Sequence, residues 1–227
     1  MSLQLDFPAV LERWPHFLSG AVLTLELATF ATVAGAILGT LVAIGRGRGG
    51  PTVRALSSAY VETIRNTPFL VQIFLVYFGL ASVGLKLSVF VVAAAALTIN
   101  VGAYTAEIMR AGIDSIPAAQ IEAAEGLALS RLQIYWHIVL LPAVERVYPA
   151  LTSQFVLLML ASSVCSQISA EELTAVANYI QSDTYRAFET YIVVALIYIA
   201  LSLLMRAGFW AFGLLIFPRR RRLGTAL

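Results

Sequence analysis

The sequence has little charge and few side chains that bind metals. Only 12% of its 227 residues are charged, whereas soluble domains hold about a quarter. Its single cysteine, Cys165, excludes an intrachain disulfide and a cysteine-based zinc cluster. The two histidines, His16 and His137, stand far apart in the sequence, so we expect no metal site. A net charge of +2 gives no basic stripe for phosphates, and we expect no nucleic-acid partner.

Apolar residues make up most of the chain. They account for 59% of it, and the mean hydropathy is +0.84. About 20 consecutive apolar residues in a helix cross a bilayer core, so the sequence predicts an all-α polytopic membrane protein. The first apolar run lacks the basic start and cleavage site of a secretory signal, and we expect it to be retained. Five transmembrane helices are predicted, at about 21–44, 59–80, 88–109, 148–168 and 190–212.

This pattern divides the chain into three parts. Residues 1–20 are expected to form a helix in the outer membrane interface, with an ordinary frayed lead-in as the alternative. Its apolar face would consist of Phe7, Val10, Leu11, Trp14, Phe17 and Leu18. Residues 21–214 form the five-span domain, and residues 215–227 form a basic tail. Within the domain, 45–51 is predicted to be a short loop, and Pro68 is expected to kink the second span.

Lysine and arginine residues favour one orientation in the membrane. Short loops rich in them stay cytoplasmic. With the N-terminus outside, the cytoplasmic segments hold ten of these residues and the outer segments hold three; Arg65 and Arg206 lie within spans and are not counted. The ten are Arg46, Arg48, Arg54, Arg110, Arg131, Arg146, Arg219, Arg220, Arg221 and Arg222, and the three are Arg13, Lys86 and Arg186. We therefore expect an outer N-terminus, a cytoplasmic loop at about 111–146 and a cytoplasmic C-terminus.

The cytoplasmic loop carries signals for two helices. Ser115 can cap a first helix over 118–127, because Pro117 is tolerated in a first turn. Ser130 and Gln133 have capping-box spacing, which predicts a second helix from about Arg131. We expect Pro142 and Pro149 to end that helix before the fourth span. Such a pair of helices without catalytic motifs is typical of a docking surface, and a solvated connection is the alternative.

Three segments carry a resemblance to a known family. The segment 100–113 (NVGAYTAEIMRAGI) runs on through Ser115-Ile116-Pro117 to Gln120 and to Glu122-Ala123-Ala124. The others are 65–72 (RNTPFLVQ) and Glu172-Leu173-Thr174 together with 188–191 (FETY). Together these motifs resemble the permeases of polar-amino-acid ABC importers, the histidine, glutamine, glutamate and arginine uptake family, over about 20–206. The chain is expected to be a transport subunit in the bacterial inner membrane.

The resemblance implies an assembly. A second permease, identical or homologous, would pair with this one, and an extracytoplasmic solute-binding protein would deliver the substrate. Two ATPase subunits would bind ATP and Mg, since this chain holds no phosphate-binding glycine-lysine loop and needs no cofactor of its own. The loop helix would couple to the ATPase. The coupling residues implied are Ala118, Glu122, Ala123, Ala124, Glu125, Gly126 and Ser130.

Three departures from the family pattern matter. Ala128 stands where the family usually has glycine, six residues after Glu122, while a glycine is present at Gly126. We therefore expect the turn after the loop helix to shift by about half a helical turn. The stretch 138–142 (IVLLP) is one residue longer than the family's Ile-x-Leu-Pro, which changes the register of the second helix. Leu160 and Ala161 replace charged or amide residues, so this subunit either binds a less charged part of the substrate or lacks a site.

Polar residues at membrane depth are candidates for the substrate path, with hydrogen bonding between helices as the alternative. The candidates are Gln72, Asn100, Tyr104, Gln154, Ser162 and Ser163, with Leu158 on the same face of the fourth span. We also expect ion pairs three residues apart, Glu62 with Arg65 and Glu107 with Arg110.

Two other functions compete with an importer subunit. A channel or secondary-transporter subunit for small polar solutes stays open. An intramembrane hydrolase that uses Ser162 or Ser163 is excluded, because both histidines lie outside the spans.

Overall fold

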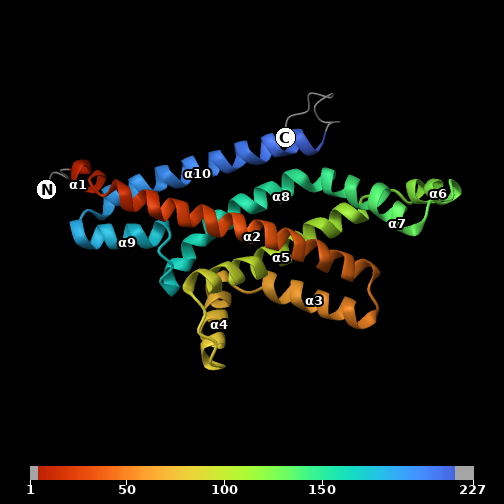
Figure 1. Cartoon of the computed structure of the whole chain (residues 1–227), viewed down its shortest axis with the longest axis horizontal. Helices are drawn as coiled ribbons and strands as arrows, with labels where there is room; N and C mark the ends of the chain where they lie inside the picture. The colour runs from red at the N-terminus through yellow and green to blue at the C-terminus, as the bar shows by residue number, and fades with distance from the viewer. Residues whose placement is uncertain (1–4, 218–227) are drawn as a thin grey trace.

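The computed structural model describes residues 5–217, and every regular element in that range is a helix (Figure 1). The elements are α1 (Phe7–Leu11), α2 (Trp14–Arg48), α3 (Pro51–Arg65), α4 (Phe69–Ser82), α5 (Val89–Asp114), α6 (Ala118–Gly126), α7 (Arg131–Gln133), the π-helix η1 (Ile134–Leu140), α8 (Leu141–Ala161), the 3₁₀-helix η2 (Ser162–Ile168), α9 (Leu173–Thr184) and α10 (Ala187–Ile216). The all-α prediction is confirmed for this part of the chain.

Four helical stretches are long and apolar enough to cross a membrane. They are Trp14–Arg48, Val89–Asp114, Arg131–Ile168 and Ala187–Ile216. The pair of α3 and α4 makes a fifth span if the two helices are taken together, and they meet at an angle of 113°. The five-span architecture is confirmed in this form. The prediction of one kinked helix over 59–80 is wrong, because Pro68 separates two helices that point in different directions (Figure 1).

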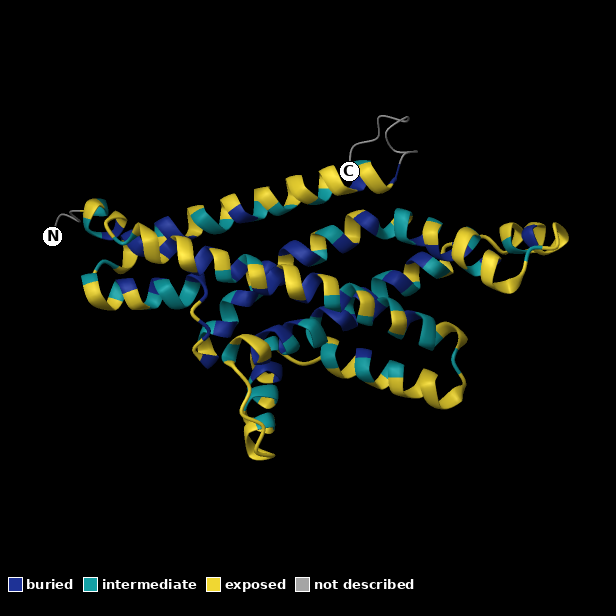
Figure 2. Cartoon of the chain, viewed as in Figure 1, coloured by how far each residue is buried: buried dark blue, intermediate teal, exposed yellow. Residues whose placement is uncertain are grey.

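The closest helix packing joins α2 to α5. Gly35 and Gly39 of α2 face Gly102 of α5, and a Cβ on Gly39 would lie 2.6 Å from the Gly102 carbonyl oxygen. Glycine at these positions lets the two backbones approach, which is how helices gain contact area in lipid. The buried residues follow this interface, whereas α4 and α10 are largely exposed in the isolated chain (Figure 2).

The N-terminal region differs from the expectation of a separate interfacial helix. The helix breaks at Glu12 and Arg13, and α2 begins at Trp14 and runs without interruption into the first span. Val10 and Phe17 are fully buried against α9 and α10, while Leu11 and Trp14 stay exposed. The lead-in is therefore packed against α9 and α10 of its own chain, and residues 14–20 belong to α2.

The predicted glycine-rich loop at 45–51 is also wrong. The helix α2 continues through Arg48, and only Gly49 and Gly50 separate it from α3, which starts at Pro51. Arg46 and Arg48 lie in the last turn of α2, where positive charge is favourable at the helix C-terminus. Pro51 lies in the first turn of α3, where its missing N–H costs nothing. The basic tail expected at 215–227 falls outside the described residues from 218 onward.

The loop between the third and fourth spans contains the predicted helices, with two corrections. Helix α6 confirms the first loop helix, and the capping box between Ser130 and Gln133 confirms the start of the second. The helix that starts at Arg131 does not end at Pro142 or Pro149 but runs into the fourth span. Pro142 lies in the first turn of α8, and Pro149 lies inside that helix, which membrane helices tolerate. A π-helix at η1 directly precedes α8.

The π-helix η1 lies where the resemblance implies an additional residue before Pro142. Its hydrogen bonds span five residues instead of four, so a turn of π-helix takes up one more residue than a turn of α-helix. Because η1 covers Ile134–Leu140, the one-residue excess falls within it or beside it. Helix α8 thereby keeps a continuous path into the membrane.

Helix α9 was not predicted from the sequence. It lies between the fourth and fifth spans, beside α1 and α2 (Figure 1). Its length of 12 residues is too short for a span, and its mixed polarity gave no hydropathy signal.

Candidate translocation path and coupling loop

Gln72 and Asn100 meet at the break between α3 and α4. The Asn100 Nδ2 donates a hydrogen bond of 2.8 Å to the Gln72 Oε1. The Gln72 Nε2 donates to the Ile64 carbonyl oxygen at 2.7 Å and to the Thr67 carbonyl oxygen at 2.9 Å. Pro68 has no N–H for the Ile64 carbonyl four residues earlier. The buried Gln72 side chain therefore supplies the hydrogen bond that the proline removes, and Asn100 holds that side chain in place.

Charged residues cluster where α2, α3 and α5 come together. Glu107 accepts from Arg46 at 2.8 Å, lies 3.7 Å from Arg65 and pairs with Arg110. The Glu107–Arg110 pair is confirmed. The prediction of a Glu62–Arg65 pair is wrong. Among the described contacts, Glu62 lies 3.9 Å from Arg46, and Arg65 pairs with Glu107. Opposite charges on neighbouring helices draw these two side chains away from each other.

Tyr104 lies beside this charged cluster. The Arg65 guanidinium lies 5.7 Å from the centre of the Tyr104 ring, close enough for a cation–π contact. Tyr104 is half-buried. It therefore stands on α5 between the Gln72–Asn100 contact and the charged residues near the predicted cytoplasmic end.

The candidates on the fourth span divide into two groups. Leu158 and Ser162 are buried within the chain, and the Ser162 hydroxyl donates to the Met159 carbonyl oxygen at 2.6 Å. Ser163 makes the same type of bond to Leu160, at 2.7 Å. Gln154 is half-buried one turn earlier. The 3₁₀-helix that starts at Ser162 contacts α4 and α5, so this end of the span lies beside the helices that carry Gln72 and Asn100.

The coupling candidates lie on α6 and at its end. Ala124 is buried, and the other six candidates are exposed: Ala118, Glu122, Ala123, Glu125, Gly126 and Ser130. Ile116, Val139 and Ala143 pack into a small cluster that includes the half-buried Ile121 of α6. This cluster and a hydrogen bond of 2.8 Å from Arg146 to the Ser115 hydroxyl fix the loop to α8. Helix α6 is therefore held on one face and free on the other.

The turn after α6 lies at Ala128, the position where the resemblance implies glycine. Ala128 has a left-handed backbone with φ of 57°. Its N–H bonds to the Glu125 carbonyl oxygen at 2.9 Å, and the Leu129 N–H bonds to the Ala124 carbonyl oxygen at 3.2 Å. These two bonds form a Schellman motif, whose left-handed position is usually glycine. The expected half-turn shift is wrong, because the turn stays at Ala128 and Gly126 is an ordinary last residue of the helix.

Glu172 is a buried acid outside the predicted substrate path. Its carboxylate caps α9 by accepting from the Thr174 and Ala175 N–H groups, both at 2.9 Å, and it also accepts from the Tyr198 hydroxyl. Burial is the largest influence and raises the pKa of Glu172 above its usual value. In the sequence, the signal for this role is an acidic residue directly before a helix, a position that favours capping. Glu172 therefore joins α9 to α10 and has a structural role.

No group of three histidine, cysteine, aspartate or glutamate side chains that could hold a metal ion occurs in residues 5–217. Cys165 is buried and His137 is exposed, in keeping with a packing role for the first and a surface position for the second.

Known proteins are similar to this chain in sequence. Residues 14–212 match the family model of the binding-protein-dependent transport system inner membrane component. The probable glutamine ABC transporter permease protein GlnM of Bacillus subtilis (strain 168) is 36% identical over 197 residues, covering 87% of this chain and 91% of that protein. The octopine transport system permease protein OccM of Rhizobium radiobacter is 33% identical over 220 residues, covering 92% of this chain and 90% of that protein.

Solved structures of ABC transporters are similar to this chain in fold. A chain from the crystal structure of an amino acid ABC transporter with histidines has a TM-score of 0.85 and 34% identity, covering 93% of this chain and 99% of that chain. A chain of the MetNI methionine ABC transporter in an inward-facing conformation shares the fold, with a TM-score of 0.68 at 20% identity and coverage of 95% and 99%. This chain therefore belongs to the binding-protein-dependent transport system inner membrane component family, the membrane-spanning permease subunits of ABC transporters.

Proposed function

We propose that this permease forms the translocation path of an ATP-driven importer for polar amino acids, together with a second permease that is identical or homologous. The names of the relatives support the substrate class, since they include glutamine and octopine permeases. Two cytoplasmic ATPase subunits bind ATP and Mg, and an extracytoplasmic solute-binding protein delivers the amino acid. The chain itself carries no cofactor and performs no hydrolysis.

Helix α6 is the observation that supports coupling to an ATPase. It projects at the end of the molecule farthest from the N-terminus (Figure 1). Beside its exposed acids Glu122 and Glu125, Leu127 and Leu132 are each 77% exposed. Large apolar side chains this exposed on a structured loop in water indicate a surface that a partner covers. We assign that partner as the ATPase subunit, with 118–130 as the contact.

The orientation follows from the arginines. Four arginines lie toward the end of the molecule that carries α6. Arg46 and Arg48 are in the last turn of α2, Arg110 is near the end of α5, and Arg131 begins α7. Under the positive-inside rule this end faces the cytoplasm. The N-terminus and α9 then face outward, and residues 1–20 meet the outer interface.

The substrate path runs past the polar groups of α4, α5 and α8. Of the seven candidate residues, Gln72, Asn100, Ser162 and Ser163 make hydrogen bonds within the chain, and Leu158 is buried. Tyr104 and Gln154 are half-buried. We therefore assign direct substrate contact to Tyr104 and Gln154 and a shaping role to the others.

The coupling assignment can be tested with a bulky residue at Gly126. Gly126 is exposed, and a Cβ added there would meet nothing within 4 Å beyond its own helix backbone, so Gly126→Trp should fold and insert normally. We expect it to lower substrate-stimulated ATPase activity toward the unstimulated rate, because the indole occupies the contact surface. Gly47→Trp is the matched control, since Gly47 also has open space around it but lies on α2. Full stimulation in Gly126→Trp would show that the contact lies elsewhere.

Purification of the tagged chain in mild detergent tests the assembly. We expect an ATPase and a second permease to co-elute, and import in proteoliposomes to require ATP. Import that proceeds without any ATPase would instead support a channel or a secondary transporter.

Cysteine labelling tests the orientation. Cys165 is fully buried, so labelling of the wild type by an impermeant maleimide should be low. Tyr185, which is 89% exposed between α9 and α10, should label as cysteine from outside. Gly126→Cys should label only from the cytoplasmic side. Labelling of both from one side would contradict the proposed topology.

A further inference from the structure

Arg206 is a charged residue inside an apolar span. It lies ten residues before the end of α10, about 15 Å of helix. Its neighbours Met205 and Phe209 line a cavity together with Thr32 and Ala36, which lie near the middle of α2. Arg206 is therefore at mid-depth in the membrane, too deep for a position in the headgroup layer.

The Arg206 side chain is exposed and has no acidic partner among the described residues. An arginine that faces lipid at this depth costs several kcal/mol, and intramembrane charges are usually turned toward protein or a water-filled path. The face of α10 that carries Arg206 is therefore covered in the assembled transporter or lines its path.

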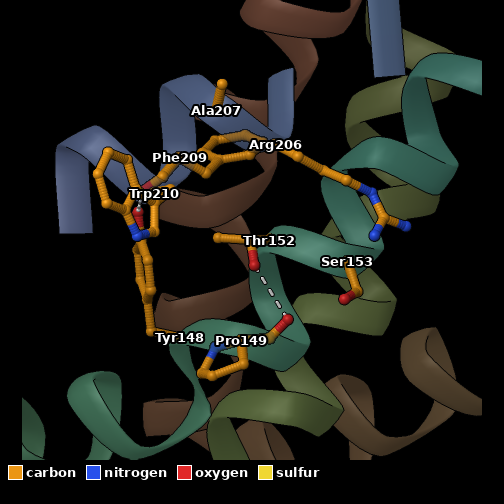
Figure 3. A pocket seen from close by; sticks show the side chains of 8 residues that line it. All are labelled: Tyr148, Pro149, Thr152, Ser153, Arg206, Ala207, Phe209 and Trp210. Carbon is orange, nitrogen blue, oxygen red and sulfur yellow. Dashed lines mark hydrogen bonds between the residues drawn. The ribbon is translucent and has the colours of Figure 1, made fainter. Parts of the chain in front are cut away.

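Arg206 borders a cavity of about 600 Å³ between α8 and α10. The cavity is lined by Tyr148, Pro149, Thr152, Ser153, Arg206, Ala207, Phe209 and Trp210. Figure 3 shows the Arg206 side chain extending from α10 toward α8, with its guanidinium on the side of Ser153. The Thr152 hydroxyl donates to the Pro149 carbonyl oxygen at 3.0 Å.

The chemistry of this cavity fits an anion. Arg206 is the only charged side chain among its lining residues. Ser153 is exposed, and its hydroxyl makes no hydrogen bond to another described residue. A guanidinium and a hydroxyl that share one cavity can both donate to the two oxygens of a carboxylate. The rest of the wall is largely apolar, and its aromatic side chains would surround the remainder of a small molecule.

We propose that this cavity binds the α-carboxylate of the amino acid during translocation, with Arg206 as the principal donor and Ser153 as the second. The proposal rests on the proposed import function and names the group by which this permease holds its substrate. Recognition of the carboxylate is common to all amino acids. It therefore suits a subunit with the uncharged residues Leu160 and Ala161 on its fourth span.

The test uses the complete transporter in proteoliposomes, with ATPase and solute-binding protein. The probes are radiolabelled glutamine, glutamate, arginine and histidine. For a probe that the wild type imports, Arg206→Gln should lower the maximal import rate roughly ten- to hundredfold, because a hydrogen bond to a charged group is lost. The half-saturating external concentration should stay unchanged, since the binding protein sets it. Arg206→Lys should recover part of the rate, because it keeps the charge and loses the two-pronged contact.

Two more variants test the second donor and provide a control. Ser153→Ala should lower the rate by only about two- to tenfold, because it removes a single neutral donor. Leu204→Gln is the matched control: it places the same amide in α10 on a different face, at a residue that is 60% exposed, and should import normally.

Three outcomes would overturn the proposal. Import by Arg206→Gln at the wild-type rate would show that Arg206 does not bind substrate. Loss of the co-purifying second permease in Arg206→Gln would show that Arg206 pairs with a partner carboxylate. If the wild type imports none of the four probes, the proposed function fails first, and the inference fails with it.

Discussion

Adding one methyl group to Gly39 should destabilise the protein, whereas the same change at Gly47 should not. Both glycines lie in α2. A Cβ at Gly39 would lie 2.5 Å from the Thr105 Cβ and 2.6 Å from the Gly102 carbonyl oxygen, both on α5. A Cβ at Gly47 would meet nothing within 4 Å. The two substitutions therefore share their intrinsic effect on the helix and differ in packing.

The expected magnitude combines two opposing effects. Replacing glycine by alanine inside a helix stabilises it by up to about 1 kcal/mol. At Gly39 the added atom strikes backbone, which cannot rotate away, so α2 and α5 must separate. Overpacking of this kind costs about 1–3 kcal/mol. We therefore expect Gly39→Ala to lose roughly 1–2 kcal/mol and Gly47→Ala to gain up to about 1 kcal/mol.

Thermal unfolding in one detergent, followed by the loss of the monodisperse peak in size-exclusion chromatography, measures the difference. For a chain of this size 1 kcal/mol corresponds to about 2–4 °C, so a difference of about 1–3 kcal/mol should make Gly39→Ala unfold roughly 2–12 °C below Gly47→Ala. Equal unfolding temperatures, or a higher one for Gly39→Ala, would refute the close approach of α2 to α5. The same result would remove the reason for glycine on both helices.

Two further predictions concern the loop and the broken span. Ala128→Gly should stabilise the end of α6 by about 1 kcal/mol, because a non-glycine residue is strained in the left-handed region; limited proteolysis of the loop should slow, whereas Ala128→Val should accelerate it. Gln72→Leu should lower stability by about 1–3 kcal/mol for each group left without a partner, since the Ile64 carbonyl and the Asn100 amide lose their hydrogen bonds. Thermal unfolding checks the second prediction against the exposed control Gln167→Leu, and equal unfolding temperatures for the two variants would contradict it.

Local patterns determined much of the loop at 111–146. The capping box at Ser130 depends on atoms only three residues apart, so the sequence alone specified it. The first loop helix followed from the proline and the strong helix formers at its start. The left-handed position of Ala128 could not be predicted in this way, because alanine carries no signal for that conformation.

The membrane spans show a similar limit. Hydropathy predicted most ends of the first, third and fifth spans to within a few residues. The exception is the beginning of α2, which starts earlier than expected. It could not show that α3 and α4 meet at 113°, because a break at Pro68 and a mild kink have the same composition. The direction of the break depends on Gln72 and Asn100, which are 28 residues apart in the sequence.

The sequence by itself determined the class of protein, the number of spans, and the existence and position of the loop helix. These properties depend on the free energy of transferring each segment from water to lipid and on hydrogen bonds within a few residues, which are local quantities. Only the tertiary structure decided which polar groups satisfy one another and which remain free. It paired Glu107 with three arginines from three helices, and it left Arg206 and Ser153 facing one cavity. Such contacts depend on how closely helices distant in sequence approach, and glycines such as Gly39 and Gly102 set that distance.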